Sequence, residues 1–247
     1  MVRFTLALLG SLVLNACAAD VVADHTDRRT RLERAAAEGK IEDIRSMLVS
    51  GADPNVRGET WTWPVAAAAA RPHNAEVIRA LLAAGANPNP DGTDEYDGYD
   101  SPLFRAIVIE DSENTRSLLE GGASVKSYFL TDTAHLNAEI MRQLVTHGLD
   151  EFQVDNYGRN LLHQMLRWDP GPKPELVDYL IQTGVPLNAR DADGRTPLGY
   201  WRQPRDFELR PFWCWLTNCL RADEIVHDPQ AARAKISRLL EQSGARL

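Results

Sequence analysis

The chain has 247 residues, of which 44% are hydrophobic and 25% charged, and its formal net charge is −8. This composition is that of a soluble globular protein, and it excludes a disordered tail and a multi-pass membrane protein. The acidic balance argues against a nucleic-acid partner, because binding a polyanion needs clustered Lys and Arg. A partner attracted over distance would instead present a basic surface.

The N-terminus is typical of an export signal. Met1–Arg3 is short and positive, and the apolar run Phe4–Leu14 follows it. That run is shorter than the about 20 apolar residues that span a bilayer, but it suits the central region of a signal peptide. The next residues, Leu14-Asn-Ala-Cys17, resemble the lipobox of bacterial lipoproteins, in which the Cys is acylated once the leader is removed.

The sequence therefore predicts a signal peptide over residues 1–16 and a lipidated tether over residues 17–28, with the lipid on Cys17. Ordinary cleavage after Ala18 is the alternative, and both interpretations place the mature chain outside the cytoplasm. No Asp follows Cys17 directly, which by analogy with enterobacterial sorting favours a periplasmic protein held at the outer membrane.

Two further cysteines, Cys214 and Cys219, form an even pair in a chain expected to be exported. Residues five apart lie on different faces of a helix, so a disulfide would need a turn between them, for which Thr217-Asn218 is suited. Two buried thiols are the alternative. Zinc is not expected, because no second Cys or His pair lies at ligand spacing.

Internal repeats dominate the rest of the chain. Pairs of Gly and a small or apolar residue recur at Gly51-Ala52, Gly85-Ala86, Gly122-Ala123, Gly148-Leu149, Gly184-Val185 and Gly244-Ala245. Most of them follow an apolar stripe at helical spacing, as in Ile41, Ile44 and Leu48. A Gly directly after such a stripe fits a left-handed residue that closes a helix.

A second motif precedes each of these helices. It occurs at Thr30–Ala36, Trp63–Ala69, Ser101–Ile107, Asn160–Leu166 and Thr196–Tyr200. In two copies, Ser101-Pro102 and Thr196-Pro197, a hydroxyl residue stands before Pro, which predicts an N-cap followed by Pro at the first helical position. Each unit is thus a short capped helix, a turn, a second helix that ends at Gly, and a loop.

These motifs resemble the ankyrin repeat, most closely in Met47–Asn55, Leu81–Asn89, Gly158–His163 and Gly194–Leu198. The resemblance implies an all-α fold: an ankyrin-repeat solenoid of about six helix-turn-helix units with short β-hairpin-like finger loops. It covers a domain over residues 29–247. The unit over 127–150 is short and is expected to have a degraded first helix, and the last repeat holds an insertion over about 202–228, which Trp213 and Trp215 are expected to hold to the stack.

No catalytic, phosphate-binding or dinucleotide motif is present in the sequence. We therefore expect no enzyme activity, no cofactor and no metal. His163 matches the His of the repeat motif, and the resemblance implies that it bonds to the backbone of a neighbouring repeat.

Two segments are candidates for contact with a partner. The loop Asp91–Asp100 combines carboxylates with tyrosines, and we expect Asp94, Glu95, Tyr96, Asp97 and Tyr99 to bind a basic protein surface. A solvated acidic loop without a role and a calcium loop are the alternatives, although the carboxylate spacing is not that of an EF-hand.

Trp61 and Trp63 form the second candidate, because residues two apart lie on one side of an extended segment. In a solenoid the fingers and first helices line a concave groove, and Trp168 is expected to face the same groove as the two Trp. The alternative for the two Trp is packing between neighbouring fingers.

The resemblance and the export signal together imply a membrane-tethered module that binds another protein. One interpretation is an immunity protein that neutralises an antibacterial toxin, such as a lipase effector, in the periplasm. A periplasmic accessory protein in oxidative-stress defence and an envelope enzyme are the alternatives. The sequence does not indicate an oligomeric state.

Overall fold

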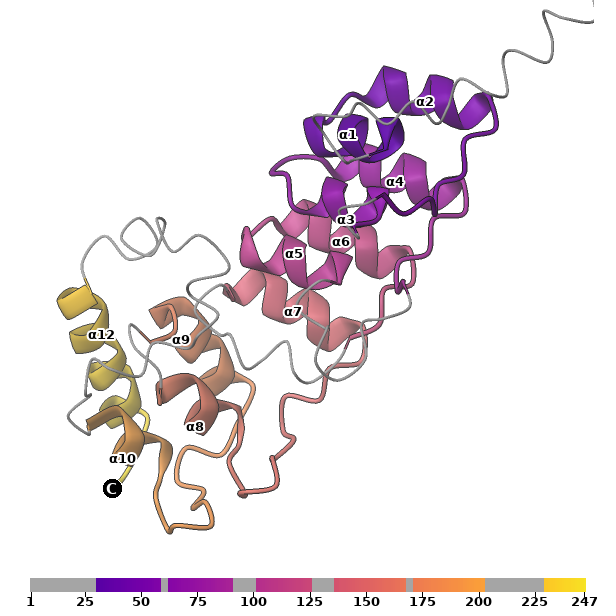
Figure 1. The fold of residues 1–247 in the computed structure, drawn as a ribbon. Helices are drawn as coiled ribbons and strands as arrows, with labels where there is room; N and C mark the ends of the chain where they lie inside the picture. The colour runs from indigo at the N-terminus through magenta and orange to yellow at the C-terminus, as the bar shows by residue number, and fades with distance from the viewer. Residues whose placement is uncertain (1–29, 59–61, 91–100, 126–135, 168–170, 203–228) are drawn as a thin grey trace, which may run out of the picture. The chain divides into compact units, whose positions relative to one another are not determined.

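The computed structural model describes residues 30–58, 62–90, 101–125, 136–167, 171–202 and 229–247. Within these ranges the regular secondary structure is α-helical, without strands. The contacts between residues group the chain into two compact units, Met1–Ser124 (unit 1) and Val125–Leu247 (unit 2). Figure 1 shows the helices of both units.

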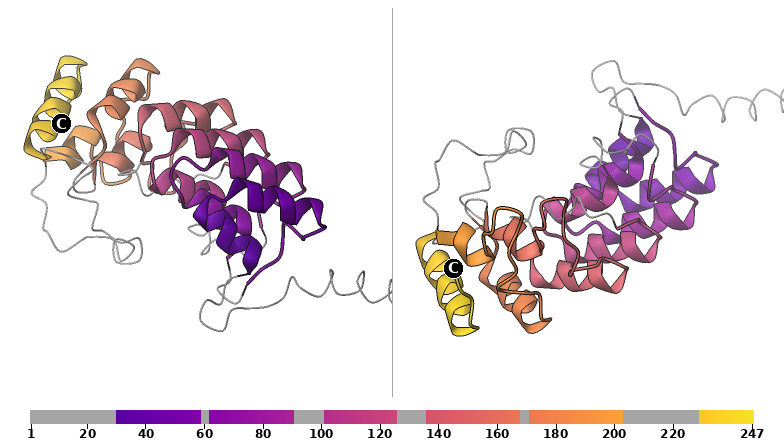
Figure 2. Two further views of the ribbon diagram at one scale, coloured as in Figure 1. Left: turned by 90° about the horizontal axis from the view of Figure 1, so that it is seen from above. Right: turned by 90° about the horizontal axis from the view of Figure 1, so that it is seen from below.

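Unit 1 is built from helix pairs stacked in two rows. Its helices are α1 (Arg31–Glu38), α2 (Ile41–Val49), α3 (Pro64–Ala69), α4 (Ala75–Ala83), α5 (Pro102–Val108) and α6 (Ser112–Glu120). The first helices α1, α3 and α5 contact one another in order, and the second helices α2, α4 and α6 form a parallel row against them. The two rows are visible from both directions in Figure 2.

Unit 2 has the same organisation. Its helices are α7 (Ala138–Thr146), α8 (Leu161–Leu166), α9 (Pro174–Gln182), α10 (Pro197–Arg202) and α12 (Pro229–Gln242). Helices α7, α9 and α12 contact in order as the row of second helices, while α8 contacts α10 in the row of first helices.

The predicted N-caps begin several of the first helices. The side chains of Thr30, Ser101 and Asn160 each accept a hydrogen bond at 3.1 Å from the backbone N–H three residues on. Thr196 accepts in the same way from the N–H of Gly199 at 3.2 Å. Trp63 stands in the cap position of α3 but forms no side-chain cap bond, so Pro64 alone marks that start.

The six predicted glycine stops are confirmed. Gly51, Gly85, Gly122, Gly148, Gly184 and Gly244 all adopt positive φ, between 86° and 100°. An L side chain is strained in that conformation, whereas glycine adopts it without a steric cost. These residues therefore end the second helices and turn the chain toward the next finger loop.

The core of each unit lies between its two rows. In unit 1 the alanines of α3 are buried, so α1 and α5 pack closely on either side of it. From the second helices, Ile78 and Leu118 are fully buried, as is Leu144 of unit 2. The predicted stripe of the last helix is also present, since Ile236 and Leu240 of α12 are buried.

Several predicted features fall outside the described residues. These are the signal peptide over 1–16, the tether over 17–28, the degraded first helix of the unit over 127–150, and the insertion over about 202–228 apart from Arg202 at the end of α10. They remain predictions from the sequence.

Candidate interaction surface

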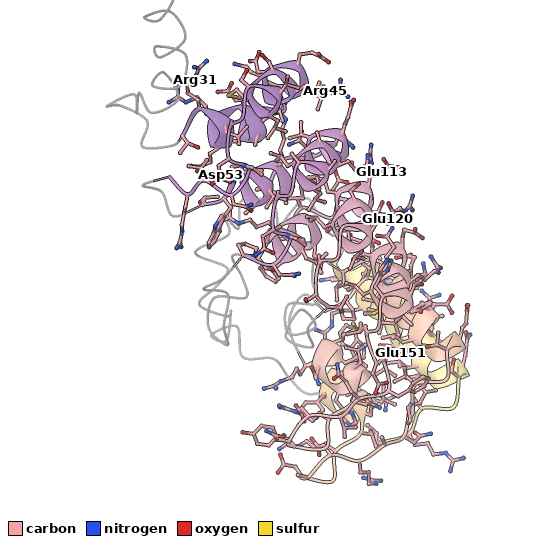
Figure 3. All side chains as sticks on the ribbon, turned by 90° about the vertical axis from the view of Figure 1, so that its right-hand side faces the viewer. Arg31, Arg45, Asp53, Glu113, Glu120 and Glu151 are labelled. Atoms are coloured by element: carbon pink, nitrogen blue, oxygen red, sulfur yellow. The ribbon has the colours of Figure 1, made fainter. Side chains whose placement is uncertain are left out.

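The second helices of unit 1 are joined by charged side chains on their outer surface. Arg45 of α2 contacts Glu42 at 2.8 Å and reaches Glu76 of α4 at 2.6 Å. Arg79 of α4 donates to the Ser117 hydroxyl of α6 at 3.0 Å. Arg45 projects outward in Figure 3, where Glu113 and Glu120 of α6 are also labelled on the outer face. These cations join neighbouring repeats, while the outer face keeps exposed carboxylates.

The second helices of unit 2 are joined similarly. The guanidinium carbon of Arg142 on α7 lies 5.3 Å from the ring centroid of Tyr179 on α9, and Glu175 of α9 pairs with Lys235 of α12 at 2.8 Å. Such exposed pairs contribute about 0–1 kcal/mol each, so they align repeats more than they stabilise them. Among the described residues of these rows, Val49 at the end of α2 is the large apolar side chain that is exposed.

Asparagines hold the loops that follow the second helices. Asn55 donates through Nδ2 to the carbonyl of Gly85 at 2.9 Å and accepts from the N–H of Asn87 at 2.7 Å. Asn89 makes the corresponding bonds to Gly122 and Ser124, and Asn188 makes them to Gly244 and Arg246. The base of each of these loops is therefore fixed to the next repeat.

Of the partner-binding residues predicted from the sequence, the structure describes Trp63. Its backbone is extended (φ −91°, ψ 151°), its side chain is half-buried, and the guanidinium carbon of Arg57 lies 4.2 Å from its ring centroid. A Trp ring stacked on a guanidinium is held in one orientation and keeps part of its surface exposed. This arrangement suits an anchor for a partner.

The other predicted site residues lie outside the described residues. They are Cys17, Trp61, Asp94, Glu95, Tyr96, Asp97, Tyr99, Trp168, Cys214 and Cys219. That the acidic loop and the Trp pair contact a partner stays a prediction.

The finger loops of unit 2 are described and share one construction. Asp155 accepts through Oδ1 from the N–H groups of Tyr157 (2.9 Å) and Arg159 (3.0 Å), and Asp191 accepts likewise from Asp193 and Arg195. The N–H of Ala192 donates to the carbonyl of Tyr157 at 2.8 Å and ties one finger to the other. Both loops therefore have a fixed backbone.

His163 connects these fingers to the helices. It is fully buried, accepts at Nδ1 from the N–H of Asn160 at 3.2 Å, and places Nε2 at 3.0 Å from the carbonyl of Arg195 in the next repeat. The predicted bond from this His to a neighbouring backbone is thus confirmed. Burial lowers the pKa of His163, and the carbonyl of Arg195 offsets part of that effect.

This histidine predicts an acid sensitivity of unit 2. Because the folded state disfavours the charged imidazole, the contribution of His163 to stability is complete above its unfolded pKa of about 6.5 and is lost as pH falls below it. Hydrogen exchange of α8 should therefore speed up between pH 7 and pH 5 after correction for intrinsic rates. In His163→Gln that pH dependence should shrink, whereas in His147→Gln, which alters an exposed residue, it should match the parent. Equal pH dependence in all three proteins would contradict the prediction.

Sequence reasoning missed an exposed apolar cluster on the first of these fingers. Phe152, Val154 and Tyr157 are 50%, 61% and 62% exposed. A signal was present, since Phe152 and Val154 alternate with polar residues in a loop where the other repeats carry Asn, Asp and Pro. Exposed large apolar side chains grouped in one segment are typical of interaction sites.

No group of three or more potential metal ligands occurs among the described residues. A hollow of about 260 Å³ beside α1 and α2 is lined by both charge signs, including Arg34, Glu38, Lys40 and Asp43. None of the helices in the described ranges combines the length and apolar character that crossing a membrane requires.

Solved structures with this arrangement of helices are ankyrin-repeat domains. The human ASB11 ankyrin repeat domain superposes with a TM-score of 0.61 at 19% identity, covering 89% of this chain and 86% of that one. An ankyrin repeat domain from Acinetobacter baumannii gives 0.57 at 23% identity, covering 87% and 98%. This chain has the ankyrin-repeat fold. The expected fold class is therefore confirmed.

A third ankyrin-like match comes from a complex in Bdellovibrio bacteriovorus, that of a predatory endopeptidase with an immunity protein. Its TM-score is 0.54 at 17% identity, and the match covers 85% of this chain and 99% of that one. No family model and no curated protein matches the sequence. At these identities the matches establish the ankyrin-repeat fold alone. Evidence about a partner has to come from the residues of this chain.

Proposed function

We propose that this ankyrin-repeat protein is an exported module that binds another protein, and that it serves as an immunity or inhibitor protein. The observation that carries the binding role is the contrast between its surfaces. Arg45, Arg79 and Lys235 of the second helices are used in inter-repeat contacts. The first finger of unit 2 instead exposes Phe152, Val154 and Tyr157 on a fixed backbone. Preorganised aromatic side chains are typical hot spots of protein interfaces.

The immunity role is supported by the ankyrin-like match in the endopeptidase–immunity complex. An inhibitor needs a shape that covers an enzyme and no chemistry of its own, and a stack of helix pairs with projecting fingers supplies such a surface. A toxin that attacks the envelope, for example a lipase effector, is the partner we propose.

The contact residues that we propose in unit 1 are Trp61, Trp63 and the acidic loop with Asp94, Glu95, Tyr96, Asp97 and Tyr99. Trp168 is proposed as a further contact from unit 2. With a net charge of −8, the chain would attract a partner with a basic surface and speed the encounter.

The proposed location is the periplasm, with the protein held at a membrane through lipidated Cys17. In Cys17→Ser we expect the protein to leave the membrane fraction or to keep its leader, because stable anchoring needs more than one acyl chain. Fractionation of cells with mass measurement of the product tests this. Processed Cys17→Ser protein that still sediments with membranes would contradict it.

We also propose that Cys214 and Cys219 form a disulfide in this compartment.

The experiment that tests the function is affinity capture from envelope extract with the mature chain, followed by mass spectrometry. We expect one stoichiometric partner with a basic surface, whose enzymatic activity is inhibited at an equimolar ratio. Recovery of a partner whose activity is unaffected would support binding and reject the inhibitor role.

A further inference from the structure

Three exposed large apolar side chains lie on the first finger of unit 2, and we name them the finger patch: Phe152, Val154 and Tyr157. These three residues lie within one loop between α7 and α8, and each is at least half exposed. In every other finger of the described residues, large apolar side chains with such exposure are absent. The finger patch is therefore a local feature of this repeat.

At position 152 this repeat lacks the Asn side chain that bonds to the next repeat elsewhere in the chain. Counted from the glycine that ends the preceding helix, Phe152 occupies the place of Asn55, Asn89 and Asn188, whose side chains bond to the next repeat. Phe152 instead exposes half of its surface. The ring cannot form the inter-repeat hydrogen bond of Asn, and the exposed half of its surface is available to a partner.

The backbone under the finger patch is held in place. The carboxylate of Asp150 accepts from the N–H of Phe152 at 2.9 Å, and that of Asp155 accepts from the N–H of Tyr157 at 2.9 Å. The carbonyl of Tyr157 accepts from Ala192 at 2.8 Å. A partner would therefore meet a loop whose backbone is already ordered by the fold.

The charges around the finger patch indicate the partner's chemistry. Arg159 is paired with Asp155 at 2.6 Å and lies 4.5 Å from the ring centroid of Tyr157, so its charge is neutralised. On the adjoining finger, Arg195 lies 3.8 Å from Asp193. Asp150 and Glu151 form no ion pair with another described residue. Glu151 is labelled in Figure 3. Arg190 of the adjoining finger donates to the backbone carbonyls of Gly194 and Leu247. The charge directly next to Phe152 in the chain is therefore negative and unmatched by a described cation.

We propose that the finger patch is a docking surface for a protein segment that places large apolar side chains next to Lys or Arg. The apolar side chains pack on Phe152, Val154 and Tyr157, and the cations face Asp150 and Glu151. This inference rests on the proposed function only because it takes the partner to be a protein. It adds a contact in unit 2 to those proposed for Trp61, Trp63 and the acidic loop.

The test uses the full mature chain and short fluorescein-labelled synthetic peptides. One peptide alternates Leu and Tyr with Lys, a second has Glu in place of Lys, and a third has Ser in place of Leu and Tyr. Fluorescence anisotropy should show that the first peptide binds the parent and that the other two bind at least roughly tenfold more weakly. Phe152→Ser combined with Tyr157→Ser should weaken the first peptide by a similar factor, because it removes the aromatic contacts.

The matched control is Val49→Ser, which removes an apolar side chain that is 90% exposed on α2 and should leave binding unchanged. Asp150→Asn with Glu151→Gln should weaken binding severalfold and flatten its salt dependence.

The inference would be overturned if the double Ser variant bound the first peptide as tightly as the parent does, or if the parent bound the Glu peptide as tightly as the Lys peptide. It would also be overturned if the parent formed a dimer that the double Ser variant does not form, or if the variant lost hydrogen-exchange protection in α8. The last two would mean that a second copy or the chain itself covers the patch. If the double Ser variant still captures the same partner from envelope extract, this inference fails while the proposed function stands.

Discussion

Replacing Trp201 with Ala is expected to cost unit 2 roughly 4 kcal/mol of unfolding free energy, the range of a large buried aromatic truncated to a methyl group. Trp201 is 2% exposed at the contact between α10 and α12. Its Nε1 donates to the Ser237 hydroxyl at 3.0 Å, and the guanidinium carbon of Arg233 lies 4.6 Å from its ring centroid. Both contacts join α10 to α12, so α12 should be the helix that detaches.

Hydrogen exchange followed peptide by peptide measures this effect directly. Protection of α12 should collapse in Trp201→Ala, while that of α4, which belongs to unit 1, should stay at the parent level. Trp201→Phe is the matched control, because it keeps most of the volume and loses the hydrogen bond, worth about 1 kcal/mol. If Trp201→Ala lowered the protection of α12 no further than Trp201→Phe, the ring would not be what holds α12.

Replacing Asn114 with Ala should destabilise unit 1 by roughly 3 kcal/mol, because it leaves the buried N–H of Asn74 without a partner and removes the bond to the Arg71 carbonyl. Asn114 on α6 is fully buried. Its Oδ1 accepts from the N–H of Asn74 at 3.1 Å, and its Nδ2 donates to the carbonyl of Arg71 at 2.7 Å. Asn74 in turn donates to the carbonyls of Ala36 and Ala68 at 2.9 and 3.0 Å. The two amides thus link three successive repeats through backbone groups, and the bonds of Asn74 are buried.

The chain supplies a matched control in Asn55, which makes the same two kinds of bond to the next repeat but is exposed. In Asn55→Ala water replaces the lost partners, so the cost should stay within about 1 kcal/mol. Urea unfolding followed by circular dichroism compares the two variants. Similar midpoints for both would show that burial of the amide does not set its contribution.

The contrast between Asn55 and Asn114 also shows what the sequence could predict. The apolar stripes, the glycine stops and the N-caps at Thr30, Ser101 and Asn160 are local signals, and each is present as expected. The burial of Asn114 was not predictable in this way, because a polar residue in a helix is ordinarily exposed. Only the packing of α4 against α6 places it inside.

The finger patch was missed for a related reason. Phe152 and Val154 lie in a loop of a repeat that lacks the usual first-helix motif, so the repeat frame gave no reason to single them out. An isolated Phe in a sequence is more often a core residue, and its exposure follows from loop geometry that Asp150 and Asp155 fix. Trp63, which the sequence predicted as a partner contact, has a half-buried ring against Arg57, and its contact with a partner stays a prediction.

The measurement that tests the central claim most directly is a binding titration between the captured envelope partner and the purified mature chain. We expect a one-to-one complex whose dissociation constant rises more than roughly tenfold in Trp61→Ala/Trp63→Ala, mainly through faster dissociation. Thermal unfolding measured in parallel should show that the double variant keeps its fold. An extract that yields no stoichiometric partner, or a partner that binds the double variant and the finger-patch variant as tightly as the parent, would contradict the account.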